Sequence, residues 1–142
     1  MATGVRVSSE SIEAYQNIKL GKKQKYIVFC VNDSKTEIIV DKALSGKQIE
    51  KYNDFVDLLP QKEPRWAVYD FQFEADGGGQ RNKLVLIKWV PDDAGIRPKM
   101  LYAGSNDELR KSLDGIAVEV QATDYDEVAY EIVLAKAKQG TR

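Results

Sequence analysis

The chain has 142 residues, of which 43% are hydrophobic and 30% are charged, a composition typical of one soluble domain. We therefore treat residues 1–142 as a single domain with a core over about 5–138. Lysine and arginine number 21 against 22 acidic residues, so we expect no nucleic-acid partner and no bulk attraction to an anionic membrane. The absence of histidine excludes histidine-dependent catalytic triads and most zinc sites, and the single cysteine, Cys30, excludes an internal disulfide.

No apolar run reaches the roughly 20 residues that a bilayer span requires, and the first residues lack the apolar stretch of a secretory signal. Together with the lone cysteine, these features predict a soluble protein of a reducing intracellular compartment. We expect no membrane insertion, no metal, no cofactor and no enzymatic activity.

The N-terminal part of the chain predicts one helix and one buried strand. Residues 9–20 have apolar side chains at helical spacing, Ser8 or Ser9 can cap the segment, and Gly21 ends it. The nearly continuous apolar run over 26–31 is typical of a strand buried on both faces, which makes Cys30 an inert core residue. The apolar positions of the helix are Ile12, Tyr15, Ile18 and Leu20.

The middle of the chain predicts a strand, a helix and a β-hairpin. A strand over 36–41 follows turn residues, and apolar residues at helical spacing predict a helix over 46–59. Two apolar segments, 66–74 and 83–90, flank the glycines at 77–79 and predict a hairpin with a flexible tip. These glycines could also cradle a phosphate, but no Lys-Ser/Thr pair follows them and a strand comes next, so we favour the hairpin.

The C-terminal part predicts a long helix, a strand and a last helix. The long helix begins near Ile96, and Gly104 followed by capping-type residues predicts a break or kink within it. A strand over 116–121 and a helix over 124–138 complete the chain. The apolar positions are Ile96, Met100, Ala103, Leu109 and Leu113 in the first helix, and Val128, Ile132 and Leu134 in the second.

These elements run in the order αββαββαβα, which predicts an α/β fold with a central mixed β-sheet flanked by helices. Two acidic groups, Asp92 with Asp93 and Asp124 with Asp126 and Glu127, could supply metal oxygens. Neither group has the ligand spacing of a calcium loop, so we interpret the acids as caps of helix N-termini.

Charges are segregated along the chain although they nearly cancel. The stretches 14–32, 77–91 and 132–142 contain cations and no acid, whereas acids concentrate in 50–63 and 107–131. A solvated surface of mixed charge is the simplest explanation, because segregation along a chain need not produce patches in space. The residues alone therefore indicate an α/β binding module with basic stretches.

Several longer segments resemble the actin-depolymerising factor/cofilin family across nearly the whole chain. In chain order they are IKLGKKQKYIVF, NDSKTEIIV, LLPQKEPRWAVYDFQF, RNKLVLIKWVPD, IRPKMLYAGSNDELRKSL and GIAVEVQATD. The combination of YDFQF, WVPD, the R-P-K-M start of a helix and VQATD is highly specific. The resemblance implies a single actin-depolymerising-factor homology domain, in agreement with the order of elements above.

The resemblance also implies that the N-terminal segment and the long helix wedge into a cleft of actin. An apolar ridge flanked by cations suits a hydrophobic cleft on an acidic partner. Spacing alone instead favours core packing for Met100. The residues that match the family's contact with actin monomers and filaments are Thr3, Gly4, Val5, Arg97, Lys99, Met100, Ser105, Asn106 and Arg110.

A second family surface contacts only filaments. Arg81 and Lys83 alternate along the predicted hairpin strand, so their side chains share a face. Ala135 and Gln139 replace charges that are common in the family, so we expect weaker severing than in relatives with a fully charged tail. The residues that the resemblance assigns to this surface are Arg81, Lys83, Lys136 and Lys138.

Two regulatory features also follow from the resemblance. Thr3 matches a serine that is an inhibitory phosphorylation site in some members, so we expect a phosphate there to oppose actin binding. Phosphoinositides compete with actin in the family through overlapping cations. The candidate headgroup ligands are Lys19, Lys22, Lys23, Lys25, Arg97 and Lys99.

We therefore predict a monomeric protein that binds actin monomers and filaments, prefers the ADP form, severs and depolymerises filaments, and promotes actin turnover. It would act in the cytoplasm at the actin cytoskeleton, with the nucleus left open as a second location. The alternative is a monomer-sequestering or filament-side-binding relative with weak severing. A remote alternative is a small phosphate-binding enzyme that uses the glycine loop.

Overall fold

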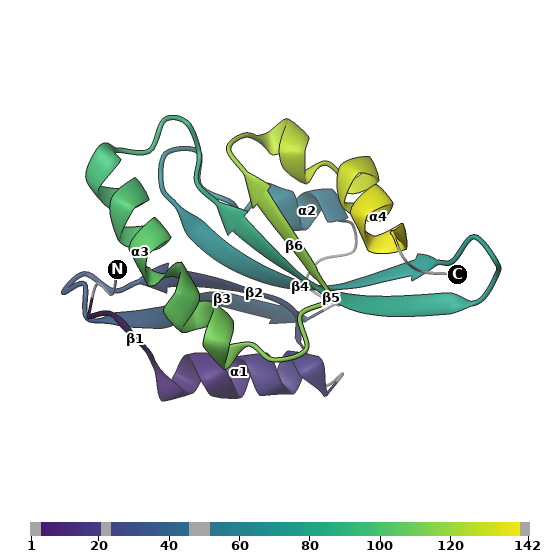
Figure 1. Cartoon of the computed structure of the whole chain (residues 1–142), viewed down its shortest axis with the longest axis horizontal. Coiled ribbons are helices and arrows are strands. Elements are labelled where there is room, and N and C mark those ends of the chain that lie inside the picture. The colour runs from purple at the N-terminus through teal and green to yellow at the C-terminus, as the bar shows by residue number, and fades with distance from the viewer. Residues whose placement is uncertain (1–3, 21–23, 46–51, 140–142) are drawn as a thin grey trace.

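A single mixed β-sheet organises the chain in the computed structural model, which describes residues 4–20, 24–45 and 52–139 (Figure 1). The strand order is β1-β3-β2-β4-β5-β6; β2 to β5 pair antiparallel, whereas β1 and β6 pair in parallel with β3 and β5. The mixed sheet of the expected α/β fold is therefore confirmed. The strands are β1 (Arg6–Val7), β2 (Gln24–Val31), β3 (Glu37–Ser45), β4 (Arg65–Glu74), β5 (Gln80–Trp89) and β6 (Val118–Ala122).

Helices cover both faces of this sheet. The α-helices are α1 (Ser9–Lys19), α2 (Tyr52–Val56), α3 (Ile96–Ser112) and α4 (Tyr130–Lys138), and a short 3-10 helix, η1 (Tyr125–Val128), precedes α4. Figure 1 shows α1 and α3 on one side of the strands and α2 and α4 on the other. The strands supply buried side chains to both layers, as the apolar run of β2 predicts.

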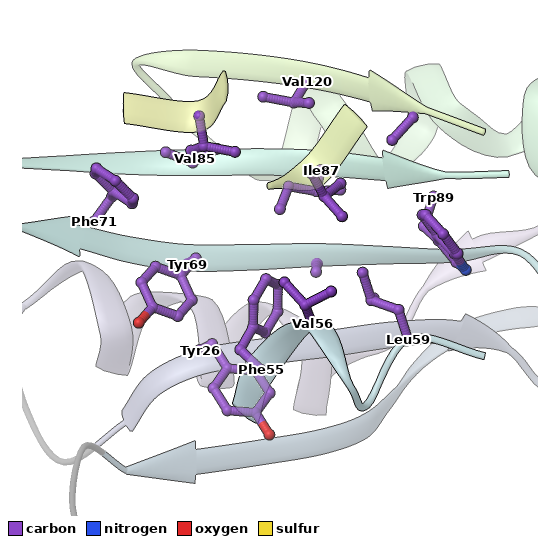
Figure 2. Close-up of a cluster of buried hydrophobic side chains, with 14 of the residues drawn as sticks. Tyr26, Phe55, Val56, Leu59, Tyr69, Phe71, Val85, Ile87, Trp89 and Val120 are labelled. Atoms are coloured by element: carbon purple, nitrogen blue, oxygen red, sulfur yellow. The ribbon is translucent and has the colours of Figure 1, made fainter. Parts of the chain in front are cut away.

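Two hydrophobic clusters hold these layers together. On the α2 and α4 side, Phe55 and Val133 pack with strand residues that include Tyr26, and Figure 2 shows the centre of this cluster. On the α1 and α3 side, Tyr15 and Leu109 pack against alternate residues of the same strands. Tyr102 and Leu109 of the second cluster hold α3 against the sheet, with one side of the helix left at the surface.

Strand β1 was not expected, because its two residues are too few to show a periodicity. In α1, Ser8 caps the helix as predicted, with its hydroxyl accepting from Ser11 N. The expected apolar face of α1 is wrong at Ile12 and Leu20, which are exposed, whereas Ser11 is buried and donates to Ile38 O at 2.9 Å. The expected stop at Gly21 lies outside the described residues.

Helix α2 is shorter than the predicted 46–59, of which 46–51 lie outside the described residues. After Val56 the backbone forms tight turns, in which Leu58 N donates to Phe55 O and Leu59 N to Val56 O. The proline at 60 disfavours helical geometry in Leu59, the last residue of the predicted helix.

Helix α3 runs without a break through Gly104, so the expected break is wrong, whereas the expected kink stays a prediction. Ser105 does not cap a second helix, because its Oγ donates to Leu101 O at 2.7 Å within the same helix. Gly95, rather than Asp92 or Asp93, is the N-cap residue of α3.

The predicted last helix is divided in two. Asp124 caps η1 as expected, with its side chain accepting from Glu127 N, but Ala129 then adopts an extended conformation and α4 starts at Tyr130. Consequently a different side of α4 faces the core from the one expected: Val133 and Ala137 are buried, whereas Ile132 is exposed.

The β4–β5 hairpin is confirmed, with a ladder from Arg65↔Trp89 to Glu74↔Gln80. At its tip, Gly78 and Gly79 have φ values of 91° and 87°, which other residues rarely adopt. Figure 1 shows this hairpin extending past the rest of the sheet, with the end of α4 beside it.

Candidate functional site

The start of α3 presents an apolar ridge to solvent. Ile96 and Met100 are 77% and 69% exposed, and they lie one helical turn apart. Arg97 and Lys99 flank them, and Lys99 Nζ donates to Asp92 O at 3.0 Å, which fixes this cation beside the helix start. We call Ile96, Arg97, Lys99 and Met100 the α3 ridge. Core packing of Met100, which spacing alone favours, is wrong.

Two predicted contact residues of α3 face the protein instead. Ser105 is 1% exposed, so a partner cannot reach its side chain in this structure. Asn106 is half-buried, and its Oδ1 accepts a hydrogen bond from Trp66 Nε1 at 3.2 Å. Tyr102 packs against the same indole, with ring centroids 4.5 Å apart and the ring planes tilted by 30°. These residues hold α3 on the sheet and thereby position the α3 ridge.

Arg110 belongs to the other end of α3. Its Nη1 donates to Leu113 O at 3.0 Å, and its Nε lies 3.3 Å from Glu119 Oε1. The rise of an α-helix separates it from Arg97 by about 20 Å. The structure therefore does not bring Arg110 together with the α3 ridge.

The N-terminal contact residues are also divided. Gly4 is exposed, with a φ of 81° that favours glycine, whereas Val5 is 4% exposed and packs with Tyr15 in the core. The side chain of Val5 is therefore covered in this structure, and its assignment as an actin-contact residue stays a prediction. Thr3 lies outside the described residues.

A cavity of about 710 Å³ adjoins Arg97 between the start of α3, the β2–β3 turn and the segment before β4. Arg65 on its wall is paired with Asp41 and Glu63, at 3.3 and 2.9 Å. Cys30 also lines the cavity and is half-buried rather than fully buried. Burial raises the pKa of its thiol, which supports the expectation that Cys30 is unreactive.

The hairpin and the end of α4 form a second basic surface. Arg81 and Lys83 pair with Phe73 and Phe71 of β4, so they do share one side of the strand. Lys83 Nζ donates to Ala137 O at 2.8 Å, and Lys138 Nζ lies 2.9 Å from Asp76 Oδ1. We call Arg81, Lys83 and Lys138 the hairpin surface.

Lys136 lies apart from the hairpin surface. It lines a separate hollow of about 430 Å³ together with β6 and η1 residues, among them Gln121 and Glu127. The four predicted filament-contact residues therefore divide into three that come together and one that does not.

The candidate phosphoinositide ligands are dispersed. Lys22 and Lys23 lie outside the described residues. Lys19 pairs with Asp114 at 2.6 Å beyond the C-terminal end of α3, about 25 Å along the helix from Arg97. Lys25 lies 5.6 Å from the centre of the Tyr69 ring, and burial lowers its pKa while Asp70 opposes that shift. Among the described members of this set, only Arg97 and Lys99 share one turn of a helix, at the start of α3.

Within the described ranges, no group of three or more His, Cys, Asp or Glu side chains is placed to hold a metal ion. No helix in the same ranges has both the length and the apolarity to cross a bilayer. The capping interpretation is confirmed for Asp124, whose Oδ1 accepts from Glu127 N, and is wrong for Asp92 and Asp93, which do not cap α3.

The chain is similar to known proteins over nearly its whole length. A family profile described as "Cofilin/tropomyosin-type actin-binding protein" matches residues 4–138. The cofilin of Mycosarcoma maydis is 47% identical over 141 residues, which is 99% of each chain. The cofilin of Schizosaccharomyces pombe is 49% identical over 134 residues, covering 94% of this chain and 95% of the relative.

Structural comparison agrees with the sequence matches. The crystal structure of Streptomyces griseoflavus cofilin has a TM-score of 0.88 and 49% identity, and the match covers 96% of this chain and 98% of that one. The shared fold includes the sheet and the helices that carry the α3 ridge and the hairpin surface. The chain therefore belongs to the cofilin/actin-depolymerising factor family.

Proposed function

We propose that this protein binds actin monomers and filaments through the α3 ridge and binds filaments additionally through the hairpin surface. It is an actin-binding, filament-depolymerising protein of the cofilin type, as its family membership indicates. The observation that carries the assignment of the surface is the exposure of Ile96 and Met100 between two cations.

The α3 ridge suits a helix-in-groove mode of binding. An exposed apolar pair one turn apart gains free energy when a hydrophobic cleft covers it, and the adjacent cations favour an acidic rim. Trp66 and Asn106 hold α3 against the sheet through a hydrogen bond of 3.2 Å, so little reorganisation should oppose docking.

The hairpin surface lies on another part of the fold. It contains Arg81 on β5 and the C-terminal end of α4, whereas the α3 ridge lies on the opposite side of the sheet. A filament offers two neighbouring subunits and a monomer offers one, so two separate surfaces allow filament-specific contacts. Binding changes filament twist and promotes severing only insofar as the protein binds the two filament states with different affinities.

The finer features of this proposal are a preference for ADP-actin, a monomeric state, action in the cytoplasm and no enzymatic role. A phosphoinositide headgroup would compete with actin at Arg97 and Lys99, because both cations belong to the α3 ridge. The phosphate-binding enzyme is not favoured, since the glycine loop leads into strand β5 rather than a helix N-terminus. Phosphorylation at Thr3 remains a prediction.

The proposal is tested by filament cosedimentation and fluorescence titration of ADP-actin monomers. The parent should bind both, and Arg81→Glu should weaken filament binding while monomer affinity is retained. Arg81 is preferred to Lys83 for this reversal, because a carboxylate at 83 would face the carbonyl of Ala137. Glu13→Gln on α1 serves as the control for a single exposed charge. Equal loss of both affinities in Arg81→Glu would contradict a separate filament surface, and a parent that does not sediment with filaments would refute the function.

A further inference from the structure

Two contacts join the β4–β5 hairpin to the end of α4, although the partners are far apart in sequence. Lys83 Nζ donates to Ala137 O at 2.8 Å, which places a cation at the carbonyl end of α4. Lys138 Nζ lies 2.9 Å from Asp76 Oδ1, at the first turn of the hairpin tip. Because Figure 1 shows the hairpin extending past the sheet, these contacts act where the strand ladder gives the least lateral support.

The tip would otherwise be the most adaptable part of the hairpin. It contains three consecutive glycines, and two of them adopt positive φ values. Glycine carries the largest backbone entropy of any residue, so an unrestrained tip would lose much of it on binding a partner. A contact that restricts the tip beforehand reduces this cost and thereby strengthens binding.

We propose that Asp76 is a positioning residue for filament binding, which acts through Lys138 and orders the hairpin that presents Arg81. Lys83 supports the same arrangement by fixing the last turn of α4 to β5. The inference rests on the proposed function, because it takes Arg81 as the side chain that meets the filament. It assigns to the Asp76–Lys138 ion pair a role within this protein that is separate from the contact of Lys138 with the filament.

Removal of the Asp76 charge should change filament affinity in opposite directions, according to whether Asp76 acts by positioning the hairpin or only by its charge. Asp76 is an exposed acid beside a surface that would meet an acidic partner, so its removal should by itself tighten filament binding. Loss of positioning should instead weaken filament binding. The direction of change in Asp76→Asn therefore separates the two effects.

The test compares the affinities of the full-length protein and its variants for ADP-actin filaments by cosedimentation, and for monomers by titration. Asp76→Asn should weaken filament binding about threefold, within the range expected for an exposed ion pair, and should leave monomer affinity unchanged. Lys138→Gln should weaken filament binding at least as much as Asp76→Asn does. When Asp76→Asn is added to Lys138→Gln, the affinity for filaments should not fall further. Exchange of the charges, Asp76→Lys with Lys138→Asp, should restore part of the loss that Asp76→Asn causes.

Glu74→Gln is the matched control, because it removes an acid from the same hairpin and leaves the Asp76–Lys138 pair in place. Amide hydrogen exchange at residues 77–80 provides a second measurement, and it should accelerate in Asp76→Asn but not in Glu74→Gln. Unchanged or tighter filament binding by Asp76→Asn would overturn the inference, as would additive losses in the double variant. If the parent itself fails to bind filaments, the proposed function fails first; if the parent binds and Asp76→Asn binds equally, only the inference fails.

Discussion

Truncation of Met100 separates binding from folding at the α3 ridge. Met100 is 69% exposed, so Met100→Ala removes few contacts within the protein, and alanine keeps the helix propensity high. We expect the free energy of unfolding to change by less than about 0.5 kcal/mol. The same substitution removes the part of the side chain that a partner's cleft would cover.

The expected loss of affinity follows from the exposed fraction. Complete burial of a methionine side chain is worth about 1.5–3 kcal/mol. Since the 69% of Met100 that is exposed is what a partner can still bury, its removal should cost about 1–2 kcal/mol of binding free energy. This corresponds to an increase in Kd of about 5- to 30-fold.

The assay is fluorescence titration of ADP-actin monomers, with urea unfolding of the same samples. Leu109→Ala is the contrasting variant, because Leu109 lies on the same helix but is fully buried. It should lower the free energy of unfolding by about 2–5 kcal/mol. An unchanged Kd for Met100→Ala, together with unchanged stability, would refute the assignment of the α3 ridge.

Two further predictions concern stability. Asn106→Ala removes the acceptor of Trp66 Nε1 and should lower the free energy of unfolding, measured in urea, by about 1 kcal/mol, with little change in the actin affinity of the folded protein. Unchanged stability with weaker actin binding would show instead that Asn106 contacts actin directly. The hydrogen bond and charge of Lys19 hold the pKa of Asp114 below its ordinary value of 3.8. The ionised carboxylate therefore stabilises the fold above pH 3.8, and this stabilisation is lost as the pH falls through the pKa of the folded state. Lys19→Gln should therefore lose less stability than the parent between pH 6 and pH 3, and equal losses in urea midpoint would contradict this role for the pair.

Much of the sheet could be predicted because strand patterns and turn glycines are local signals. The apolar run of β2 and the glycines at 77–79 define their elements without reference to the rest of the chain. By contrast, Ala129 has no feature that marks a break, so the division between η1 and α4 was not predictable. Strand β1 depends on pairing with β3, whose paired residues lie 31 positions later in the chain.

The sequence predicted which segment forms the candidate site, but not which of its side chains face solvent. Ile96 and Met100 have the spacing of a core face, yet Tyr102 and Leu109 are buried instead, because spacing alone does not show which apolar side of a helix packs against the sheet. No local signal shows that Ser105 turns inward, since its hydroxyl finds its acceptor within the helix. The partnership of Asp76 with Lys138 joins residues 62 positions apart and becomes visible only in the fold.

The most direct test of the account is fluorescence microscopy of single ADP-actin filaments exposed to the parent protein and to Met100→Ala. The account predicts that the parent decorates, fragments and shortens filaments, and that Met100→Ala requires about 5- to 30-fold more protein for the same decoration. Filaments that stay bare and intact at saturating concentrations of the parent would contradict the proposed function. Equal decoration by the parent and Met100→Ala would contradict the α3 ridge as the surface that binds actin.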